Sequence, residues 1–527
     1  MFMSNDGVRL LTTSVHCLFA LNQLALEPKV KTVMLFLGID VGSSSVKLSV
    51  LDGATGKSLG ALSHPESELA IESPAAGFAE QDPNTWWDCI RQGFARLVAR
   101  GGFDPQRIDA IGISYQMHGL VVVDKNQQVL RPSIIWCDSR AVPLGNKALD
   151  DLGRDYCFGH LLNSPGNFTA AKLRWVQENQ PEIFARIHKI MLPGDFVAMK
   201  LSGSINTTAS GLSEGTLWDF KENRVATELL AHWGIDASVV PDVVPSFGVQ
   251  SIVSDSVAAE LGLRPGVKIC YRAGDQPNNA FSLNVLEPGE VAATAGTSGV
   301  IYGVTDQPAA DTESRVNTFL HVTSTEEKKR NGVLVCVNGC GRLYSWLRQT
   351  ISAAGATPSY PQLNALAQAV PVGSDGLLFH PFGNGAERIF QNKNLGAQLR
   401  NLDFNRHGLG HMVRAAQEGI VFSLNQGFDV LKSLGGSCEV VRAGKGNMFL
   451  SDVFAQTFAN TTQAAVEMFE TDGAEGAARA AALGSGYYAS ANEAFTGLTR
   501  LSVVEPQAAL FAQYQDAYQH WVELLPK

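Results

Sequence analysis

Two aspartates far apart along the chain each follow a strand-like apolar segment and lie beside glycine. Asp40 ends the run 35–39, and Asp275 follows Gly274 after the segment 267–271. An acid at the end of a buried strand is well placed to take a proton from a hydroxyl group. Taken singly, each aspartate is equally well explained as a residue that caps a turn or a helix.

Two turns of small residues accompany these acids. Residues 42–45 read Gly-Ser-Ser-Ser directly after Asp40, and residues 296–299 read Gly-Thr-Ser-Gly between two predicted strands. Small side chains let a nucleotide approach the main chain, whose N–H groups can surround phosphate oxygens. Two carboxylates and two such turns suit phosphoryl transfer, in which positioning and Mg²⁺ provide most of the catalysis.

Two familiar catalytic patterns are weaker candidates. The tripeptide 56–58, Gly-Lys-Ser, resembles the end of a P-loop, but the position that requires the first glycine of that motif is Leu51. Residues 211–215 have the GxSxG spacing of a nucleophile elbow, which needs a strand before it and a helix after it. The preceding residues 206–210 make a poor buried strand, so we favour a structural role for this serine.

The histidine and cysteine patterns do not indicate a metal site. His407 and His411 are four residues apart, but Gly408 and Gly410 weaken the helix that such a pair would need. The eight cysteines are scattered and form no CxxC pair. This usage indicates a reducing, cytoplasmic location rather than a disulfide framework.

The elements that must position the acids alternate between strands and helices, which predicts an α/β fold. The units 35–52 and 291–304 are both strand, small-residue turn, strand, and they indicate a duplicated architecture with one copy in each half. Predicted strands are 35–40, 46–52, 108–114, 119–124, 133–136, 267–271, 291–295 and 300–304. Predicted helices are 83–100 after the N-cap Asp82, then 340–353, 360–370, 409–434, 448–470 and 474–492.

Length and charge limit the classes of function. A chain of 527 residues needs two large domains, which we place at 34–282 and 283–527. A net charge of −10 argues against nucleic-acid and membrane partners.

Residues 1–33 carry a short apolar run that is too brief to span a bilayer, and Met34 directly precedes the first strand. We therefore expect residues 1–33 to lie outside the catalytic fold.

Several ordered motifs resemble those of the FGGY family of carbohydrate kinases, and of its xylulokinase branch in particular. The resemblance extends over about residues 35–500. The motifs are Gly38-Ile39-Asp40-Val41-Gly42-Ser43-Ser44-Ser45-Val46-Lys47, Glu80-Gln81-Asp82-Pro83 with Trp86-Trp87, Gln116-Met117-His118-Gly119, Ile135-Trp136-Cys137-Asp138-Ser139-Arg140, Phe168–Trp175 and Leu192-Pro193-Gly194-Asp195.

The resemblance implies a duplicated ribonuclease-H-like fold of the actin and hexokinase type, with ATP and a sugar meeting in a cleft between two domains. It implies that Asp275 is the general base and that Asp40 organises Mg²⁺ and the phosphates, with both acids near the metal. Implied sugar-binding residues are Met117, His118, Asp275, Gln276, Trp136 and Asn167. Implied ATP-binding residues are Gly42, Ser43, Ser44, Lys47, Gly296, Thr297, Gly339, Gly444, Lys445 and Asn447.

Two departures from the family pattern leave the substrates open. Gln276-Pro277-Asn278-Asn279 follows Asp275 where the family usually has asparagine next, and residues 443–446 are Ala-Gly-Lys-Gly instead of Gly-Gly-Gly-Ala. Our hypothesis is phosphorylation of D-xylulose. The alternatives are another FGGY substrate such as gluconate, ribulose or another ketose or polyol, a non-catalytic sugar-responsive protein, and an actin- or chaperone-like ATPase. The nucleotide preference and homodimer formation stay open.

Overall fold

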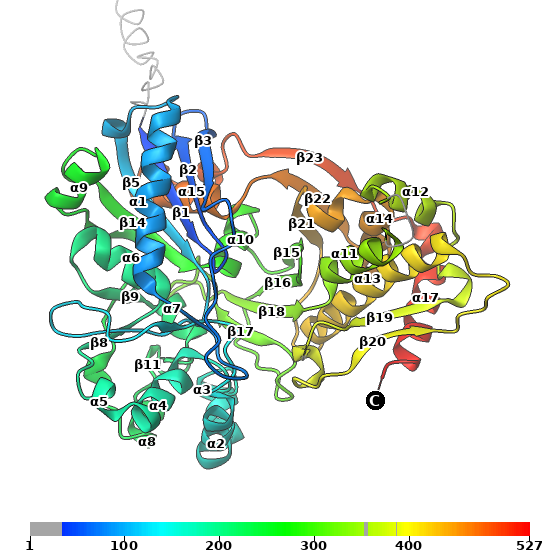
Figure 1. Cartoon of the computed structure of the whole chain (residues 1–527), viewed down its shortest axis with the longest axis horizontal. Helices are drawn as coiled ribbons and strands as arrows, with labels where there is room; N and C mark the ends of the chain where they lie inside the picture. Colours follow the sequence, from blue (N-terminus) through cyan, green and yellow to red (C-terminus); the bar gives the residue numbers. More distant parts are fainter. Residues whose placement is uncertain (1–33, 353–356, 386, 527) are drawn as a thin grey trace, which may run out of the picture. The chain divides into compact units, whose positions relative to one another are not determined.

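The computed structural model describes residues 34–352, 357–385 and 387–526 (Figure 1). From Met34 onward the chain forms one compact unit. The hypothesis about residues 1–33 lies outside the described residues.

The first sheet has six strands, and its central members are apolar and buried, as the sequence predicts. The order across the sheet is β13 (Phe247–Ile252), β14 (Lys268–Gly274), β5 (Ile108–Tyr115), β1 (Leu35–Val41), β2 (Val46–Asp52) and β3 (Lys57–His64). Strands β1, β5 and β14 run parallel, and β1 forms an antiparallel hairpin with β2. Because the three central strands are parallel, their carboxyl ends reach the same edge.

Both faces of this sheet are covered, because alternate side chains of a strand point to opposite sides. Leu37 and Ile39 of β1 pack in one cluster with residues of helices α1 (Pro83–Arg100) and α6 (Pro193–Ser202). Phe36, on the opposite face, packs with alanines of helix α15 (Gly473–Gly484). This helix therefore returns from near the end of the chain to cover the first sheet (Figure 1).

The second sheet repeats the combination of an antiparallel hairpin and parallel strands. The order across this sheet is β17 (Asn317–Leu320), β18 (Asn331–Val337), β16 (Gly299–Thr305), β15 (Glu290–Ala295), β21 (Val440–Gly444), β22 (Ala465–Glu470) and β23 (Thr499–Val504). Strands β15 and β16 form the hairpin, and β15, β21 and β22 run parallel. This repetition is the duplication that the two strand–turn–strand units predict.

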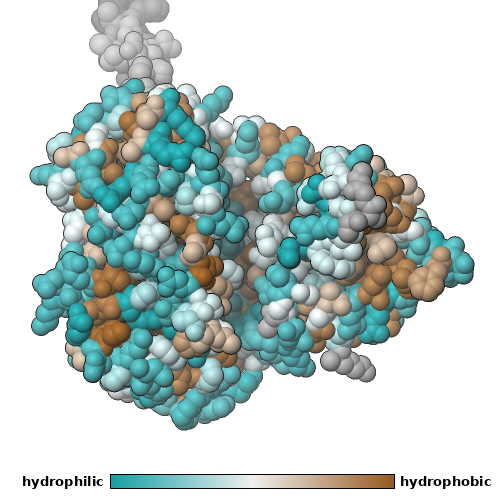
Figure 2. Space-filling view, in the orientation of Figure 1, coloured by the Kyte–Doolittle hydropathy of each residue, from teal (hydrophilic) through white to brown (hydrophobic). Residues whose placement is uncertain are grey.

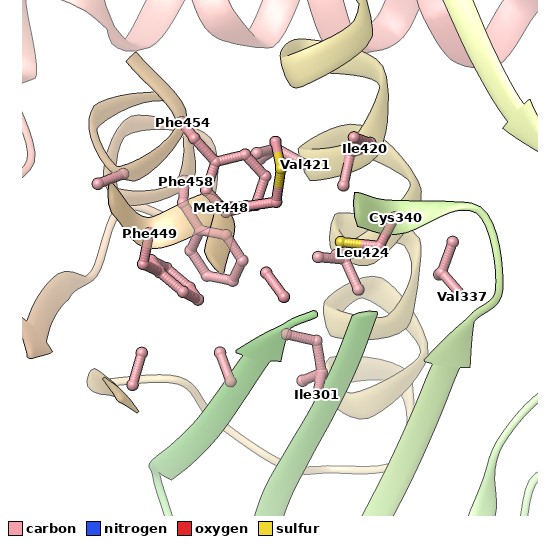
Figure 3. Packing of buried hydrophobic residues seen from close by; sticks show 14 of the residues in the cluster. Ile301, Val337, Cys340, Ile420, Val421, Leu424, Met448, Phe449, Phe454 and Phe458 are labelled. Atoms are coloured by element: carbon pink, nitrogen blue, oxygen red, sulfur yellow. The ribbon is translucent and has the colours of Figure 1, made fainter. Parts of the chain in front are cut away.

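Helices pack on one face of the second sheet and bury its largest apolar cluster. Figure 3 shows Ile301 near Leu424 of α13 (Leu409–Ser433), with Phe458 of α14 (Asp452–Thr462) on one side and Val337 on the other. Cys340 opens α11 (Cys340–Ser352) in the same cluster, so this cysteine acts as a small apolar residue.

Two predicted helices are wrong in their extents. The predicted helix 448–470 is helix α14 followed by strand β22, because Gln463 adopts φ 59° at the end of the helix and the next residues pair with β21. The predicted helix 474–492 ends at Gly484, and α16 (Ala491–Ala494) is separate. The predicted strand 133–136 contributes only β7 (Ser133–Ile134).

The surface agrees with the charged composition. Figure 2 shows a mainly hydrophilic face with separate, smaller hydrophobic areas. Within the described ranges, we find no helix with the length and apolar character that crossing a membrane requires.

Candidate active site

Asp40 lies at the carboxyl end of β1 with one hydrogen-bond donor and one cation beside it. The hydroxyl of Ser114 donates to its Oδ1 at 2.8 Å, and the Nζ of Lys47 is 3.7 Å from its Oδ2. Burial raises the pKa of Asp40, while Lys47 and Ser114 act in the opposite direction. The negative charge of Asp40 is thus only partly balanced by its neighbours, so the carboxylate can attract a further cation.

Asp275 is the first residue of helix α10 (Asp275–Ser282). Burial, and next the charge of Asp40, raise the pKa of Asp275 to about 7. The two carboxyl groups therefore lie close enough to each other for the charge on Asp40 to oppose ionisation of Asp275. A carboxyl group with a pKa near neutrality is suited to act as a general base at physiological pH.

The strand register explains why residues so distant in sequence meet. Asp40 is the register partner of Ser114 on the neighbouring strand, and Ser114 in turn is the partner of Ala273. Asp275 comes two residues after Ala273, where the chain leaves β14 and enters α10. The parallel alignment of β1, β5 and β14 thus places both acids at one edge of the sheet.

The segment before α15 completes this edge, and the sequence analysis missed it. A Cβ on Gly473 would lie 2.6 Å from Oδ2 of Asp40, and the carbonyl of Gly473 accepts a hydrogen bond from Asn278 at 2.9 Å. Asp472, whose charge also raises the pKa of Asp40, caps the helix. Like Asp40, Asp472 is an acid that follows a strand and has a glycine close behind it, but the wrong helix 448–470 concealed this pattern.

Met117 lies beside Gly274, next to Asp275, and His118 follows it in the predicted sugar site. Met117 Cγ and Glu214 Oε2 both lie within 2.6 Å of the point that a Cβ on Gly274 would occupy. His118 has φ 62°, and its Nδ1 lies 2.8 Å from the carbonyl oxygen of Glu214. Burial lowers the pKa of His118 to about 3, so the imidazole is neutral and can donate from one nitrogen.

Lys172 fixes the main chain of this loop. Its Nζ donates to the carbonyl of His118 at 2.8 Å and to that of Ile135 at 2.9 Å. Burial lowers the pKa of Lys172 to about 7. A buried lysine with two carbonyl acceptors supports the unusual backbone of His118 without itself touching solvent.

Trp136 and Asn167 connect the sugar site to the first small-residue turn. Trp136 is 46% exposed, and its Nε1 lies 3.3 Å from Oγ of Ser43. Asn167 Nδ2 donates to the carbonyl of Trp136 at 3.5 Å. The turn itself is held by Gln81, which donates to the carbonyl of Ser43 at 2.7 Å, while Ser44 stays exposed.

Several buried polar atoms in and around the predicted sugar site lack a hydrogen-bond partner among the described residues. They are Tyr115 Oη, Asn167 Oδ1, both carboxyl oxygens of Glu214, Gln276 Oε1, Asn278 Oδ1 and Arg388 Nε. Tyr115 lies near enough to Glu214 to influence its pKa, but the two groups do not form a hydrogen bond of good geometry. Buried polar groups are normally paired, so a concentration of unpaired ones indicates a polar ligand.

The second small-residue turn gathers part of the predicted ATP site. The carbonyls of Gly296 and Thr297 accept hydrogen bonds from the backbone N–H groups of Gly341 and Arg342 at 2.8 and 3.1 Å. Asn447 Nδ2 lies 3.7 Å from the point that a Cβ on Gly296 would occupy. These residues therefore lie together at the ends of β15 and α11.

The remaining predicted ATP residues differ in their surroundings. A Cβ on Gly339 would lie 1.6 Å from the carbonyl oxygen of Pro381, so packing alone requires glycine there. Gly444 ends β21 and has no neighbour closer than 3.8 Å to its Cβ position, and the N–H of Lys445 donates to Phe469. Gly42 lies in the first turn, where its N–H donates to the carbonyl of Ser45 at 3.0 Å.

Ser213 of the GxSxG pattern has a structural environment. Contrary to expectation, residues 206–208 do form a buried strand, β9 (Asn206–Thr208), and α7 (Ala209–Glu214) follows it. Ser213, however, lies within the helix and not at the turn that precedes it. Its hydroxyl donates to the carbonyl of Ser210 at 2.7 Å and accepts from the N–H of Leu320 at 2.9 Å.

The other two patterns are also structural. Gly56 lies in the turn between β2 and β3 with φ 65°, and its N–H donates to Asp52. His411 Nε2 lies 3.2 Å from Oδ2 of Asp375, and His407 accepts from the N–H of Asp403. In the part of the chain that the structure describes, no group of three or more potential metal-ligating side chains occurs.

Comparisons with known proteins agree with this architecture. Residues 35–282 match the N-terminal domain of the FGGY family of carbohydrate kinases, and residues 291–485 match its C-terminal domain. The xylulose kinase of Bacillus subtilis is 29% identical over 505 residues, which cover 93% of this chain and 97% of that protein.

Solved structures of the same family share the fold. The xylulose kinase of Rhodospirillum rubrum is 25% identical with a TM-score of 0.84, covering 93% of this chain and 98% of that chain. The gluconate kinase of Lactobacillus acidophilus, at 23% identity, has the same TM-score and covers 94% and 98%. The predicted actin- and hexokinase-like fold is thereby confirmed, and the chain belongs to the FGGY family of carbohydrate kinases.

Proposed function

We propose that this sugar kinase transfers the γ-phosphoryl group of ATP to a terminal hydroxyl of a small sugar, with D-xylulose as the favoured acceptor and D-xylulose 5-phosphate as the product. The observation that carries the proposal is the pair Asp40 and Asp275, whose carboxyl groups influence each other at one edge of the sheet. Similarity to relatives named xylulose kinase supports the choice of acceptor. A cytoplasmic location belongs to the same proposal.

Asp275 would act as the general base. Its position next to Gly274 and Met117 would let it receive the proton of the acceptor hydroxyl while the hydroxyl oxygen bonds to phosphorus and the bond to the leaving diphosphate breaks. A pKa near 7 leaves a useful fraction of Asp275 ionised at neutral pH. Bound ATP would supply the phosphoryl group, and Mg²⁺ would neutralise its developing charge.

The residues present fit a nucleotide-bound Mg²⁺. This ion is usually held by one or two carboxylates together with phosphate oxygens, and it retains several waters. Asp40 and Asp275 provide two carboxylates. In the described ranges, the one cationic group within 4 Å of Asp40 is the Nζ of Lys47, at 3.7 Å. The turns at 42–45 and 296–297, with Gly339, Gly444, Lys445 and Asn447, would hold the nucleotide.

The test is a side-by-side measurement of ADP release with xylulose, ribulose, gluconate and glycerol, for the wild type and for Asp275→Asn. We expect Asp275→Asn to bind the acceptor as the wild type does but to lose about 10²–10⁴-fold in kcat. Asp255→Asn is the matched control, because Asp255 also begins a short helix but is exposed. Near-normal kcat in Asp275→Asn would defeat the assignment of the base.

The panel also separates the alternatives. A clear preference for gluconate, ribulose or another polyol would retain the kinase but replace the acceptor. ADP release that needs no sugar would favour an ATPase, and sugar binding without turnover would favour a sensor. The division of the two domains at residue 282 stays part of this proposal.

A further inference from the structure

Arg388 is a half-buried cation with one buried donor that has no hydrogen-bond partner in the described residues. It begins the short 3-10 helix η4 (Arg388–Phe390), and its Nη2 donates to Oδ1 of Asn317 at 3.0 Å. Its Nε is buried without a hydrogen-bond partner, and no carboxylate of the described residues lies within ion-pair distance. Burial lowers the pKa of Arg388 to about 10, while the charge of Asp311 acts in the opposite direction, so the side chain stays charged at neutral pH with donors to spare.

The position of Arg388 follows from strand β17. Asn317 and Phe319 are two residues apart on this strand and point to the same side. The ring of Phe319 lies 5.4 Å from that of His118 and 6.0 Å from that of Phe168. The charge of Arg388 is felt at His118, where it contributes to lowering the pKa of the imidazole. Arg388 therefore borders the predicted sugar site from the half that otherwise carries the nucleotide residues.

Two residues near Arg388, Glu387 and Asn384, are bonded to Asn338. Both carboxyl oxygens of Glu387 accept from the N–H of Asn338, at 3.1 and 3.0 Å, and Asn384 donates to the carbonyl of Asn338 at 3.0 Å. Together with the bond from Nη2 to Asn317, these contacts orient Arg388 before any ligand binds, which reduces the entropy cost of binding.

Asp275 and Arg388 lie at opposite ends of the pair Met117–His118. Met117 approaches Gly274, next to Asp275, whereas His118 faces Phe319, next to Asn317 and Arg388. Asn167, which precedes Phe168, adds a buried unpaired oxygen on the His118 side. An acceptor whose hydroxyl reaches Asp275 would therefore direct its other end toward Arg388.

We propose that Arg388 is a specificity-determining residue that donates hydrogen bonds to a carbonyl or carboxylate oxygen at the end of the sugar remote from the phosphorylated hydroxyl. The inference rests on the proposed kinase function and narrows its substrate class to ketoses and sugar acids over alditols. Arginine only donates hydrogen bonds, so an oxygen that only accepts is its best partner. The C2 ketone of xylulose and the carboxylate of gluconate both meet this requirement.

The test compares wild type, Arg388→Met and Arg388→Lys with D-xylulose, D-gluconate and xylitol, by calorimetric binding and by steady-state kinetics. In Arg388→Met we expect Kd and KM for the preferred carbonyl or carboxylate acceptor to rise about 10- to 100-fold, with the KM for ATP unchanged. Xylitol should change by less than about threefold. The larger loss, with xylulose or with gluconate, identifies which oxygen Arg388 contacts.

Two controls keep the inference falsifiable. Arg400→Met removes an arginine of the same half that bonds to Gln398, and it should leave every constant unchanged. If Arg388→Met does not fold by thermal melting, Arg388→Lys, which keeps the charge but not the planar fork, should still show a smaller rise in the acceptor Kd. Unchanged acceptor constants, or a change confined to ATP, would overturn the role of Arg388.

The outcomes for the function and for Arg388 are separable. If the wild type binds a sugar but does not phosphorylate it, the proposed function fails and the Kd values still test Arg388. If another sugar replaces xylulose, the same comparison is made with that sugar. If no acceptor binds the wild type, both proposals fail.

Discussion

Asp40 and Asp275 combine burial with mutual repulsion, and these two effects keep a carboxyl group ready to accept a proton. Ser114 and Lys47 compensate Asp40 in part, whereas Asp275 depends on the first turn of α10 and on Gln276. Such an arrangement costs stability when both groups are ionised, as functional sites often do.

The cost predicts a pH dependence. Since the pKa of Asp275 is about 7 in the folded protein and about 3.9 in the unfolded chain, the folded state holds more protons between these values. The stability that this group contributes is therefore fully present below about pH 4 and is lost as the pH rises through 7. Asp275→Asn lacks this loss, so we expect its Tm to exceed that of the wild type by roughly 1–3 °C at pH 8.

The measurement is thermal unfolding from pH 5 to pH 8.5 with EDTA and without nucleotide. The advantage of Asp275→Asn should shrink toward pH 5, whereas Asp255→Asn should follow the wild type throughout. A difference in Tm that is the same at both ends of the range would contradict the raised pKa.

At the scale of elements, helix α15 decides how the first sheet is closed. It lies so close to β1 and β5 that a Cβ on Gly38 or Gly112 would come within 1.8 or 2.0 Å of the carbonyl oxygens of Ala474 and Ala477. The alanines of α15 let its backbone approach the strands, and the N-terminus of the helix comes to Asp40.

Gly112→Ala tests this packing. The added methyl group must push α15 away from the sheet, and we expect a loss of about 1–3 kcal/mol or more in the free energy of unfolding. Urea unfolding measures this loss. Gly159→Ala is the matched control, because Gly159 lies in helix α3 (Arg154–His160) with open space at its Cβ position. It should be neutral or stabilise by about 0.5–1 kcal/mol, and equal effects of both variants would exclude close packing as the cause.

At the scale of the whole molecule, β17 of the second sheet is bonded to the first half of the chain. Asn163 donates to the carbonyl of Thr318 at 2.7 Å and accepts from its N–H at 3.1 Å. Ser210 donates to the carbonyl of Leu320 at 3.0 Å, next to the bond that Ser213 accepts. The same strand carries Asn317 and Phe319, so these bonds also position Arg388.

Asn163→Ala removes two of these bonds and leaves the backbone groups of Thr318 buried and unpaired. We expect it to lower the free energy of unfolding by about 1–3 kcal/mol and to raise the acceptor KM more than the ATP KM, because β17 borders the sugar site. Urea unfolding and steady-state kinetics check both. Asn179→Ala, at an exposed helix end, should change neither. Loss of stability with an unchanged acceptor KM would separate β17 from acceptor binding.

The amino-acid sequence by itself determined the residues that repeat a recognisable local pattern. Asp40 and Asp275 follow apolar strands, the turns 42–45 and 296–299 are built from small residues, and both strand–turn–strand units form as predicted. These features depend on neighbours within a few positions, so composition and alternation are sufficient to find them.

The tertiary structure alone decided which distant groups meet. The closure of the first sheet by α15, the approach of Gly473 to Asp40, and the convergence of Glu214 and Arg388 on the predicted sugar site all join segments that are far apart in the sequence. Strand β22 was predicted as helix for the same reason, since its pairing with β21 overrides a weak local preference. Long-range register and packing, which no local pattern encodes, made these decisions.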